Sequence, residues 1–493
     1  MIRAILCATL VIASLAVAHA PAAAASLAAL PATVRVNIAG LGITYGVIGS
    51  TGTLTVTRTD GSLVYRGGAR TVVRRNVRRI AGAGLTVPDR SVAVAPEERQ
   101  SRAALLRAAR TAARDDGPRA IETIPFELTL LSGSSDDLGT LLLGSQRIET
   151  LLATTDDGLL TLNGKAYRGS FLVTPDDDGD LIVVNTVSTH DYLASVVGAE
   201  EPSTWEPEAL AAQAIAARTY LATHLRLHDA YDIEGDARNQ EYGGVRTEAA
   251  STVRAVERTA GVIATYRGAT IDALYSANAG GVTEDSENVY VNALPYLRSV
   301  PSPGDEVASR SSFGKTSWAW TREVTAPQLR DYLAVRGLNV GVPSRIELVR
   351  LSAAGRVLAA RVTGTLGQRD IGKDGSRYFF GLRSSLYTVR LETKEETETV
   401  EYTNSDRNGA LGVLGAERIG TLYQRAAGDA AELRLLSYTY RLPARFIFSG
   451  RGNGHGVGMS QWGAQGMALA GASAEEILTH YYTGIALTNV GGP

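Results

Sequence analysis

The segment from Pro207 to about Leu227 is the feature that most constrains the fold of this 493-residue chain. Proline suits the first turn of a helix, where its missing N–H costs no hydrogen bond. The residues that follow have helical spacing, and their apolar stripe is formed by Leu210, Ala214, Ala217 and Leu221. The small side chains of its alanines let other elements pack closely against several sides of this helix. We therefore expect a central buried helix around which the rest of the chain is arranged.

Short strands are expected on both sides of this helix. Residues 32–72 alternate between apolar and polar, with Asp60-Gly61 in the middle, which predicts a β-hairpin. Further short strands are expected over 121–190, over 262–275 and in the RFIFSG segment. Additional helices are expected near 247–258 and in the final SAEEILTHYYTG segment. The predicted fold class is α+β, rich in β-structure, with a central buried Ala-rich helix and a β-rich accessory region at the N-terminus.

Two stretches have the composition of loops, 300–317 and 391–410. The second is highly charged and leads into a segment without a clear period, so we treat 391–444 as an insertion. The expected division of the chain is a signal peptide (1–20), an N-terminal accessory region (27–145), a core (146–390), the insertion (391–444) and the C-terminal part of the core (445–489).

The first residues have the pattern of a signal peptide. Arg3 gives a positive start, Ile5 to Val17 are apolar, and Ala18-His19-Ala20 fits a cleavage site for small residues. The apolar run is too short to span a bilayer. We therefore expect an exported protein that is periplasmic, associated with the cell wall or extracellular.

Composition argues against several classes of function. Lys and Arg number 49 against 51 Asp and Glu, so a nucleic-acid partner is not expected. The single cysteine, Cys7, lies in the expected signal peptide, which excludes disulfide frameworks and cysteine-based metal sites from the mature chain.

His224 and His228 are spaced as on one helix face, but HLRLH lacks the glutamate of a zinc protease motif. The PDDDGD segment at 175–180 lacks the distal glutamate of an EF-hand and is better explained as a turn. No metal or other cofactor is expected.

Three segments carry residues suited to chemistry. The first, VVGAEEPSTW, holds the carboxylates Glu200 and Glu201 just before the central helix. The second, YSANAGGVTEDSENVY, surrounds a pair of glycines. The third, SGRGNGHGVGMSQWGAQGMA, is rich in glycine, which lets a backbone approach a ligand closely. It has neither the βαβ unit of a dinucleotide site nor the G-x-S-x-G of a serine hydrolase. The alternative to a functional site is a structural glycine turn in which the histidine has its hydrogen bonds within the protein.

These segments together resemble the SpoIID/LytB family, which comprises stage II sporulation protein D and the amidase enhancer LytB. The resemblance runs from about Ile182 to Ala486. Seven blocks stand in the family's order: DYLASVVGAE, AQAIAARTYLA, QEYGG, YSANAGGVTEDSENV, PYLRSVPSP, GLRSSLYTV and GRGNGHGVGMSQWGAQGMA.

The resemblance implies work on bacterial peptidoglycan, with its glycan strands as partner. Sporulation protein D is a lytic transglycosylase of strands that lack stem peptides, and the family's catalytic glutamate falls on Glu200. One carboxyl group can act first as acid and then as base, because the sugar's own 6-hydroxyl attacks. Such a group must be protonated near neutral pH, so we expect Val196, Val197 and the Ala-rich helix to form an apolar setting that raises its pKa. Glu201 is expected to point the other way.

The alternative function implied by the resemblance is a non-catalytic peptidoglycan-binding modifier of a cell-wall amidase. A cell-wall amidase or other wall hydrolase would then be a partner. The residues carried over as substrate-binding are Gln213, Arg218, Tyr242, Asn278, Gly280, Gly281, His455, Ser460 and Gln461. A structural role is an equal alternative for each. Some relatives hold zinc with Cys and His before the double glycine, but Ser276-Ala277-Asn278-Ala279 stands here, so no zinc is expected. We expect the three segments to meet in space.

Overall fold

The computed structural model describes residues 29–40, 45–67, 70–75, 126–131, 140–141, 150–175, 181–227, 229–402, 417–425 and 434–492. The expected signal peptide, the acidic stretch after Pro175 and His228 lie outside the described residues. Within the described ranges, no helix combines the length and the apolar character that a membrane crossing requires.

The central helix is confirmed as α3 (Pro207–His224), and every residue from Ala209 to Leu221 is buried. Its expected stripe, with Leu210 and Ala214, packs into one hydrophobic core together with strands of the N-terminal half. The opposite face, with Ala212 and Ile215, packs into a second core built from the C-terminal part of the chain. The small alanine side chains let both cores approach the same helix.

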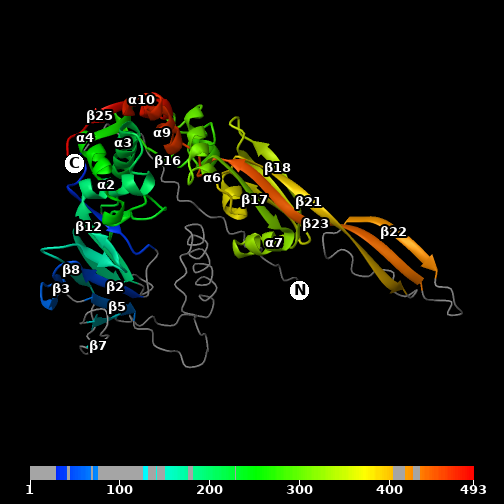
Figure 1. Cartoon of the computed structure of the whole chain (residues 1–493), viewed down its shortest axis with the longest axis horizontal. Coiled ribbons are helices and arrows are strands. Elements are labelled where there is room, and N and C mark those ends of the chain that lie inside the picture. Colours follow the sequence, from blue (N-terminus) through cyan, green and yellow to red (C-terminus); the bar gives the residue numbers. More distant parts are fainter. Residues whose placement is uncertain are drawn as a thin grey trace, which may run out of the picture.

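Two sheets form the N-terminal half of the molecule, shown in blue and cyan in Figure 1. The first has the order β13-β1-β12-β11-β8-β3-β4. Its strands are β13 (Ile233–Glu234), β1 (Thr33–Asn37), β12 (Leu181–Ser188), β11 (Ser170–Pro175), β8 (Leu151–Thr154), β3 (Leu54–Arg58) and β4 (Leu63–Gly67). β3 and β4 are the hairpin expected around Asp60-Gly61, and Gly61 has the positive φ of 83° that this tight turn needs.

The second sheet has the order β10-β9-β2-β5-β6-β7. Its strands are β10 (Lys165–Tyr167), β9 (Leu160–Leu162), β2 (Tyr45–Ser50), β5 (Arg70–Arg75), β6 (Phe126–Leu131) and β7 (Thr140–Leu141). Both sheets pair strands from before residue 145 with strands after it, so hydrogen bonding runs across the expected boundary between accessory region and core. The division into these two units stays a prediction.

Helices and short strands surround α3. The helices are α2 (Thr189–Glu200), η2 (Gly244–Thr247), α4 (Ala250–Arg258), α5 (Ser286–Val289), α9 (Gln461–Leu469) and α10 (Ala474–Tyr481). The strands are β14 (Val262–Tyr266), β15 (Ala269–Thr270), β16 (Tyr275–Ser276), β24 (Met459–Ser460) and β25 (Ala486–Asn489). The expected helices near 247–258 and in SAEEILTHYYTG are α4 and α10. β16 and β24 pair in parallel, which joins two of the three chemically interesting segments.

Residues 319–451 build an outer lobe with its own core, which includes Phe446 and Phe448. Its strands are β17 (Ala319–Thr325), β18 (Pro343–Leu351), β19 (Val357–Gly364), β20 (Gly367–Gly372), β21 (Tyr387–Tyr402), β22 (Glu417–Arg425) and β23 (Arg434–Arg451). Its helices are α7 (Ala326–Val335) and α8 (Gly375–Phe380). The ends of β21 and β23 continue with β22 as a ribbon that reaches away from the rest of the molecule (Figure 1).

Parts of both stretches expected to be loops have regular structure instead, while residues 403–410 lie outside the described residues. Residues 391–402 belong to β21, because threonine and valine alternate with charged residues and the long partner β23 supplies a continuous ladder. Residues 303–310 form a 3₁₀ helix, η3, and Lys315–Trp318 form α6. η3 begins at Pro303, which favours a helical first turn despite the loop-like composition of the segment.

Candidate active site

Glu200 is the last residue of α2. This helix begins at Ser188, whose side chain caps it by accepting a hydrogen bond from Asp191 N. Val196 and Val197, in its last turn, are fully buried and provide the expected apolar setting. The C-terminal end of a helix also carries partial negative charge, which disfavours a carboxylate there.

The carboxyl group of Glu200 receives hydrogen bonds from three segments. The backbone N–H of Glu241 donates to Oε1 at 3.2 Å, and the amide Nε2 of Gln461 donates to Oε2 at 3.2 Å. The hydroxyl of Tyr275 is a further hydrogen-bond partner. Burial raises the pKa of Glu200 to about 7, and the hydrogen bonds lower it only in part. Since its side chain remains partly exposed, this group can both give and take a proton near neutral pH.

Gln240 fixes the orientation of these partners. Its Oε1 accepts from the hydroxyl of Tyr192 at 3.1 Å, and its Nε2 donates to the hydroxyl of Tyr275 at 3.0 Å and to the carbonyl of Ala217 at 3.2 Å. The Tyr275 oxygen is thus already an acceptor from Gln240, which leaves its own proton for Glu200. Burial raises the pKa of Tyr275 well above its usual value, so the hydroxyl keeps that proton.

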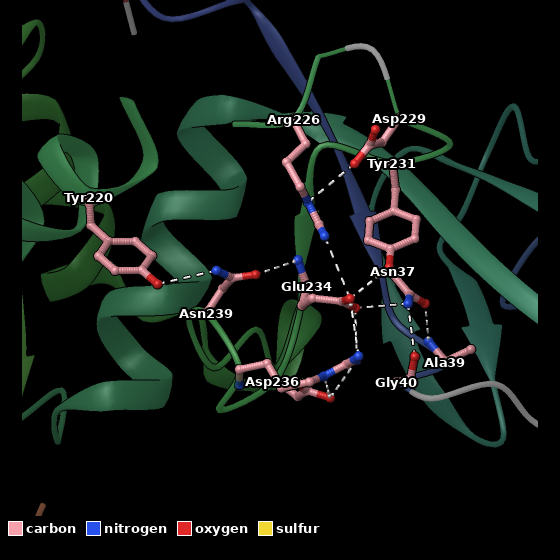
Figure 2. Close-up of polar contacts among 11 residues, drawn as sticks. Asn37, Ala39, Gly40, Tyr220, Arg226, Asp229, Tyr231, Glu234, Asp236 and Asn239 are labelled. Carbon is pink, nitrogen blue, oxygen red and sulfur yellow. Dashed lines mark hydrogen bonds and ion pairs between the residues drawn. The ribbon is translucent and has the colours of Figure 1, made fainter. Parts of the chain in front are cut away.

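The loop that carries Gln240 and Glu241 is held by a second network, shown in Figure 2. At its centre is Glu234, which is buried and accepts hydrogen bonds from Asn37, Tyr231 and Arg238. The backbone N–H of Glu234 also donates to Asn239 Oδ1, and Asn239 Nδ2 donates to the hydroxyl of Tyr220 on α3 (Figure 2). This network fixes the loop at positions just before the residues that contact Glu200.

The double glycine lies where the second segment packs against the third. Gly280 and Gly281 have φ values of 77° and 101°, which favour glycine. The Ser460 hydroxyl donates to Asp305 and accepts from the N–H of Ala279, while the other Asp305 oxygen accepts from the N–H of Gly281 at 2.9 Å. Ser460 is also the N-cap of α9, the helix that begins with Gln461. Ser460 therefore acts by placing Gln461.

Asn278 and His455 hold the same region together. Asn278 exchanges two backbone hydrogen bonds with Asn453, and its side chain bonds to the carbonyl of Asp305 and the N–H of Gly280. His455 Nδ1 accepts from the N–H of Val457 at 3.1 Å, and the backbone carbonyl of Tyr275 is its other partner. Burial lowers the pKa of His455 to about 4, so this ring is neutral at pH 7. The structure thus brings the three segments together, with Glu200 and Gln461 in direct contact.

Three predicted substrate-binding residues lie outside this cluster of contacts. Arg218 is fully buried, and its guanidinium donates to the carbonyl of Val256 in α4 and to the carbonyl of Val262 at the start of β14. Tyr242 is buried among aromatic rings and donates to Asn185 Oδ1 at 2.8 Å. Gln213 is fully buried in α3, and its amide has no hydrogen-bond partner among the described residues. All three side chains are buried inside the protein, as is typical of structural residues. Their role in binding substrate stays a prediction.

Glu201 differs sharply from its neighbour. It is 1% exposed, and its carboxyl oxygens receive no hydrogen bond from any residue that the structure describes. Burial raises its pKa well above the usual range. It is therefore a neutral acid that lacks the donors surrounding Glu200.

Two hydrogen-bond partners of Glu200, Glu241 and Tyr275, were missed by sequence reasoning, whereas a third, Gln461, was among the expected site residues. Gln240 and Glu241 lie in the QEYGG block, from which only Tyr242 was selected, and Tyr275 opens the YSANAGG block. The signal available in the sequence was that these residues lie within the blocks that resemble the family. Which member of each block faces Glu200 depends on contacts between residues up to 261 positions apart, as for Gln461.

The region of the double glycine does not suit zinc. The side chain of Asn278 is engaged in internal hydrogen bonds, and Ala277 and Ala279 offer no ligand atoms. Across the described ranges, no three His, Cys, Asp or Glu residues gather as a metal site would require. His224, from the HLRLH motif, stacks on Tyr220 with ring centroids 3.7 Å apart and lies 3.7 Å from Asp272.

Comparison with known proteins gives consistent matches. A family model described as stage II sporulation protein matches residues 177–266. An uncharacterised protein of Brachyspira hyodysenteriae is 30% identical over 342 residues, which is 68% of this chain and 76% of that protein. The amidase enhancer of Bacillus subtilis is 30% identical over 306 residues, covering 60% of this chain and 40% of that protein. Stage II sporulation protein D of Bacillus subtilis is 27% identical over 320 residues, covering 61% of this chain and 74% of that protein.

The segment matched by the family model contains Glu200, α3 and the loop with Gln240 and Glu241. The longer matches, over more than 300 residues each, extend well beyond it. On this basis the chain belongs to the SpoIID/LytB family.

Proposed function

We propose that this protein acts on the bacterial cell wall as a lytic transglycosylase that cleaves the glycan strands of peptidoglycan. The observation that carries this proposal is the carboxyl of Glu200, which is partly exposed, has a pKa of about 7 and is surrounded by hydrogen-bond donors. A general acid with a pKa near the working pH is best suited to transfer a proton in both directions.

The reaction begins with protonated Glu200. It gives its proton to the oxygen of the glycosidic bond, the C1–O bond of the muramic residue breaks, and that sugar takes on oxocarbenium character. The resulting carboxylate is stabilised by the N–H of Glu241, the amide of Gln461 and the hydroxyl of Tyr275. It then takes the proton from the 6-hydroxyl of the same muramic residue as that oxygen bonds to C1. A 1,6-anhydro ring closes, and Glu200 is protonated again.

This series of reaction steps needs only one carboxyl group. A retaining or inverting hydrolase would require a second, ionised carboxylate facing the sugar. The neighbouring carboxyl, Glu201, is buried and has a strongly raised pKa, so it does not supply one. Internal attack by the sugar's own hydroxyl needs no carboxyl group besides Glu200, and it is the reaction that we propose.

We further propose that the protein is exported and works at the wall. The pattern of residues 1–20 supports export. Peptidoglycan glycan strands would be its partner.

A second candidate function is supported by the similarity to an amidase enhancer. In that case the protein binds peptidoglycan without cutting it and modifies the activity of a cell-wall amidase. Glu200 would then contribute to binding or to local structure, and its proton would not be transferred.

The deciding experiment is incubation of the purified protein with glycan strands freed of stem peptides, followed by mass analysis. New 1,6-anhydro ends support the transglycosylase, and new reducing ends without the anhydro ring would indicate a hydrolase. Intact strands, together with stimulation of an added wall amidase, would establish the enhancer function instead.

A further inference from the structure

Three aromatic rings pack against one another at the start of α9, the helix whose first residue is Gln461. The rings of Trp205 and Trp462 have centroids 4.7 Å apart, and those of Trp462 and Phe313 have centroids 5.5 Å apart. The three residues come from separate segments: the turn after α2, the first turn of α9, and the connection between η3 and α6. We call these three residues the aromatic strip.

The strip has a buried base and an accessible edge. Trp462 is only 7% exposed, whereas Phe313 is 62% exposed and Trp205 is partly exposed. Gly314 lets the backbone lie directly against the indole, because a Cβ at this position would be 2.2 Å from Trp462 Cζ2. A large ring held at the surface over a buried indole costs solvation free energy unless a ligand covers it.

The strip is continuous with the surroundings of Glu200. Trp462 directly follows Gln461, whose amide donates to the Glu200 carboxyl. Trp205 lies in the short turn that begins at Glu201, and this turn is tied to α9 by the hydrogen bond from the N–H of Glu206 to Gln465 at 2.9 Å. The strip and Glu200 therefore share two supporting elements, the turn after α2 and the first turn of α9.

The residues that flank the rings favour a hydroxylated ligand. Ser203, Thr204 and Ser312 are exposed and adjoin Trp205 and Phe313 in sequence. A pyranose ring presents a face of C–H groups with hydroxyl groups at its edge, which matches an aromatic face bordered by hydroxyl side chains. A protein partner would need a far larger apolar area than a few rings provide.

We propose that Phe313 and Trp205 form a stacking subsite for an N-acetylated hexopyranose ring of the glycan strand. The choice of sugar rests on the proposed function, but the subsite itself is defined by binding and not by cleavage. It extends the site beyond the scissile bond and explains how the strand is held while Glu200 acts.

The test measures sugar binding in the full chain with Glu200→Gln, which prevents turnover. Oligomers of N-acetylglucosamine are titrated by calorimetry into this parent and into the parent with Phe313→Ala, Phe313→Trp or Leu469→Ala. We expect Phe313→Ala to raise the Kd about 2- to 10-fold, the range expected for loss of one aromatic stacking contact, and Phe313→Trp to restore it. Leu469 is 56% exposed at the other end of α9 and serves as the matched control, for which no change is expected.

The outcomes separate this proposal from the proposed function. Unchanged affinity in Phe313→Ala, or no oligomer binding by the parent, would overturn the subsite even if the wild-type chain forms anhydro ends. Loss of affinity in Phe313→Ala without any cleavage by the wild-type chain would support the subsite and refute the transglycosylase. If Phe313→Ala instead changes self-association in sedimentation and leaves sugar affinity intact, the strip is a protein interface and the proposal is wrong.

Discussion

Glu200 and Glu201 are neighbours in the chain with opposite surroundings. Glu200 ends α2 and receives hydrogen bonds from three distant segments, whereas Glu201 is fully enclosed and receives none from the described residues. Burial raises the pKa of both, but only Glu200 has donors that stabilise its ionised form and an exposed edge. This difference is why the proposed proton transfer is given to Glu200 and not to Glu201.

The first prediction concerns these two residues. Glu200→Gln keeps the shape and can keep hydrogen bonds but removes the transferable proton, so glycan cleavage should fall by about 10² to 10⁴-fold. Glu201→Gln replaces one neutral group by another and should change cleavage far less. Release of anhydro ends and thermal unfolding should be measured on both variants. Full activity in Glu200→Gln would rule out its role as acid, and equal losses in both would point to the turn as a whole.

The raised pKa of Glu200 also predicts how stability depends on pH. The folded state holds this proton up to about pH 7, whereas an ordinary glutamate loses it near 4.5. Between these values the folded state binds more protons than the unfolded state, so the free energy of unfolding decreases as pH rises. The contribution is at most about 3 kcal/mol. Glu201 and Asp305, whose pKa values are also raised by burial, add to the slope in the same direction.

Glu200→Gln should remove the Glu200 part of this slope. Urea unfolding at pH 5 and pH 8 should show a smaller loss of stability in Glu200→Gln than in the wild type. Activity should also fall as pH rises through about 7, because the acid must begin protonated. A wild-type and variant pair with identical pH slopes would mean that Glu200 ionises normally.

At the level of elements, the loop after β13 positions the site. Figure 2 shows Glu234 at the centre of the contacts that hold this loop to β1 and α3. Asn37 and Glu234 are 197 residues apart in sequence, so no local pattern could reveal their pairing. The helix α3 was predictable because Pro207 and its apolar stripe are local signals, as was the hairpin around Gly61. The contacts of Glu200 with Glu241 and Tyr275 were not, because they depend on how distant segments pack.

The third prediction tests this loop. Glu234→Ala removes a buried acceptor from Asn37, Tyr231 and Arg238, and should destabilise the protein by about 1–3 kcal/mol. Cleavage should fall as well, because the N–H of Glu241 loses its fixed position. Asp236→Ala is the control, since its carboxylate is partly exposed and pairs mainly with Arg238, and it should cost less than about 1 kcal/mol. Similar effects of both variants in urea unfolding and glycan cleavage would contradict the role given to Glu234.

At the level of the whole molecule, the described residues form three hydrophobic cores and one extended ribbon. Two cores share α3, and the third lies in the outer lobe between β17, α7 and β23. Residues 391–402 were misread as a loop, since charged residues such as Glu392, Lys394 and Glu395 dominate this segment. The status of 391–444 as an insertion stays a prediction.

The fourth prediction follows from the register of this ribbon. Lys394 pairs with Leu442 across the ribbon. Residues 395–441 can therefore be replaced by a two-residue turn that joins these two positions. The apolar residues of the third core, such as Phe446 and Tyr387, lie on the retained side. We expect the shortened chain to keep its glycan activity and to change its Tm by no more than about 4 °C, the shift that about 1 kcal/mol produces. Loss of folding on shortening would show that the ribbon belongs to the core of the outer lobe.

The position of α3 has a consequence for how the molecule opens. Thirteen consecutive residues of this helix, Ala209 to Leu221, are buried, and they contribute to two cores at once. Neither core can loosen locally without exposing the helix that the other core needs. Backbone amides in the middle of α3 should therefore exchange with deuterated solvent only through global unfolding, and both cores should exchange as one cooperative unit. Glu200, at the end of α2, is anchored to this unit through Val196 and Val197, which belong to the first of the two cores.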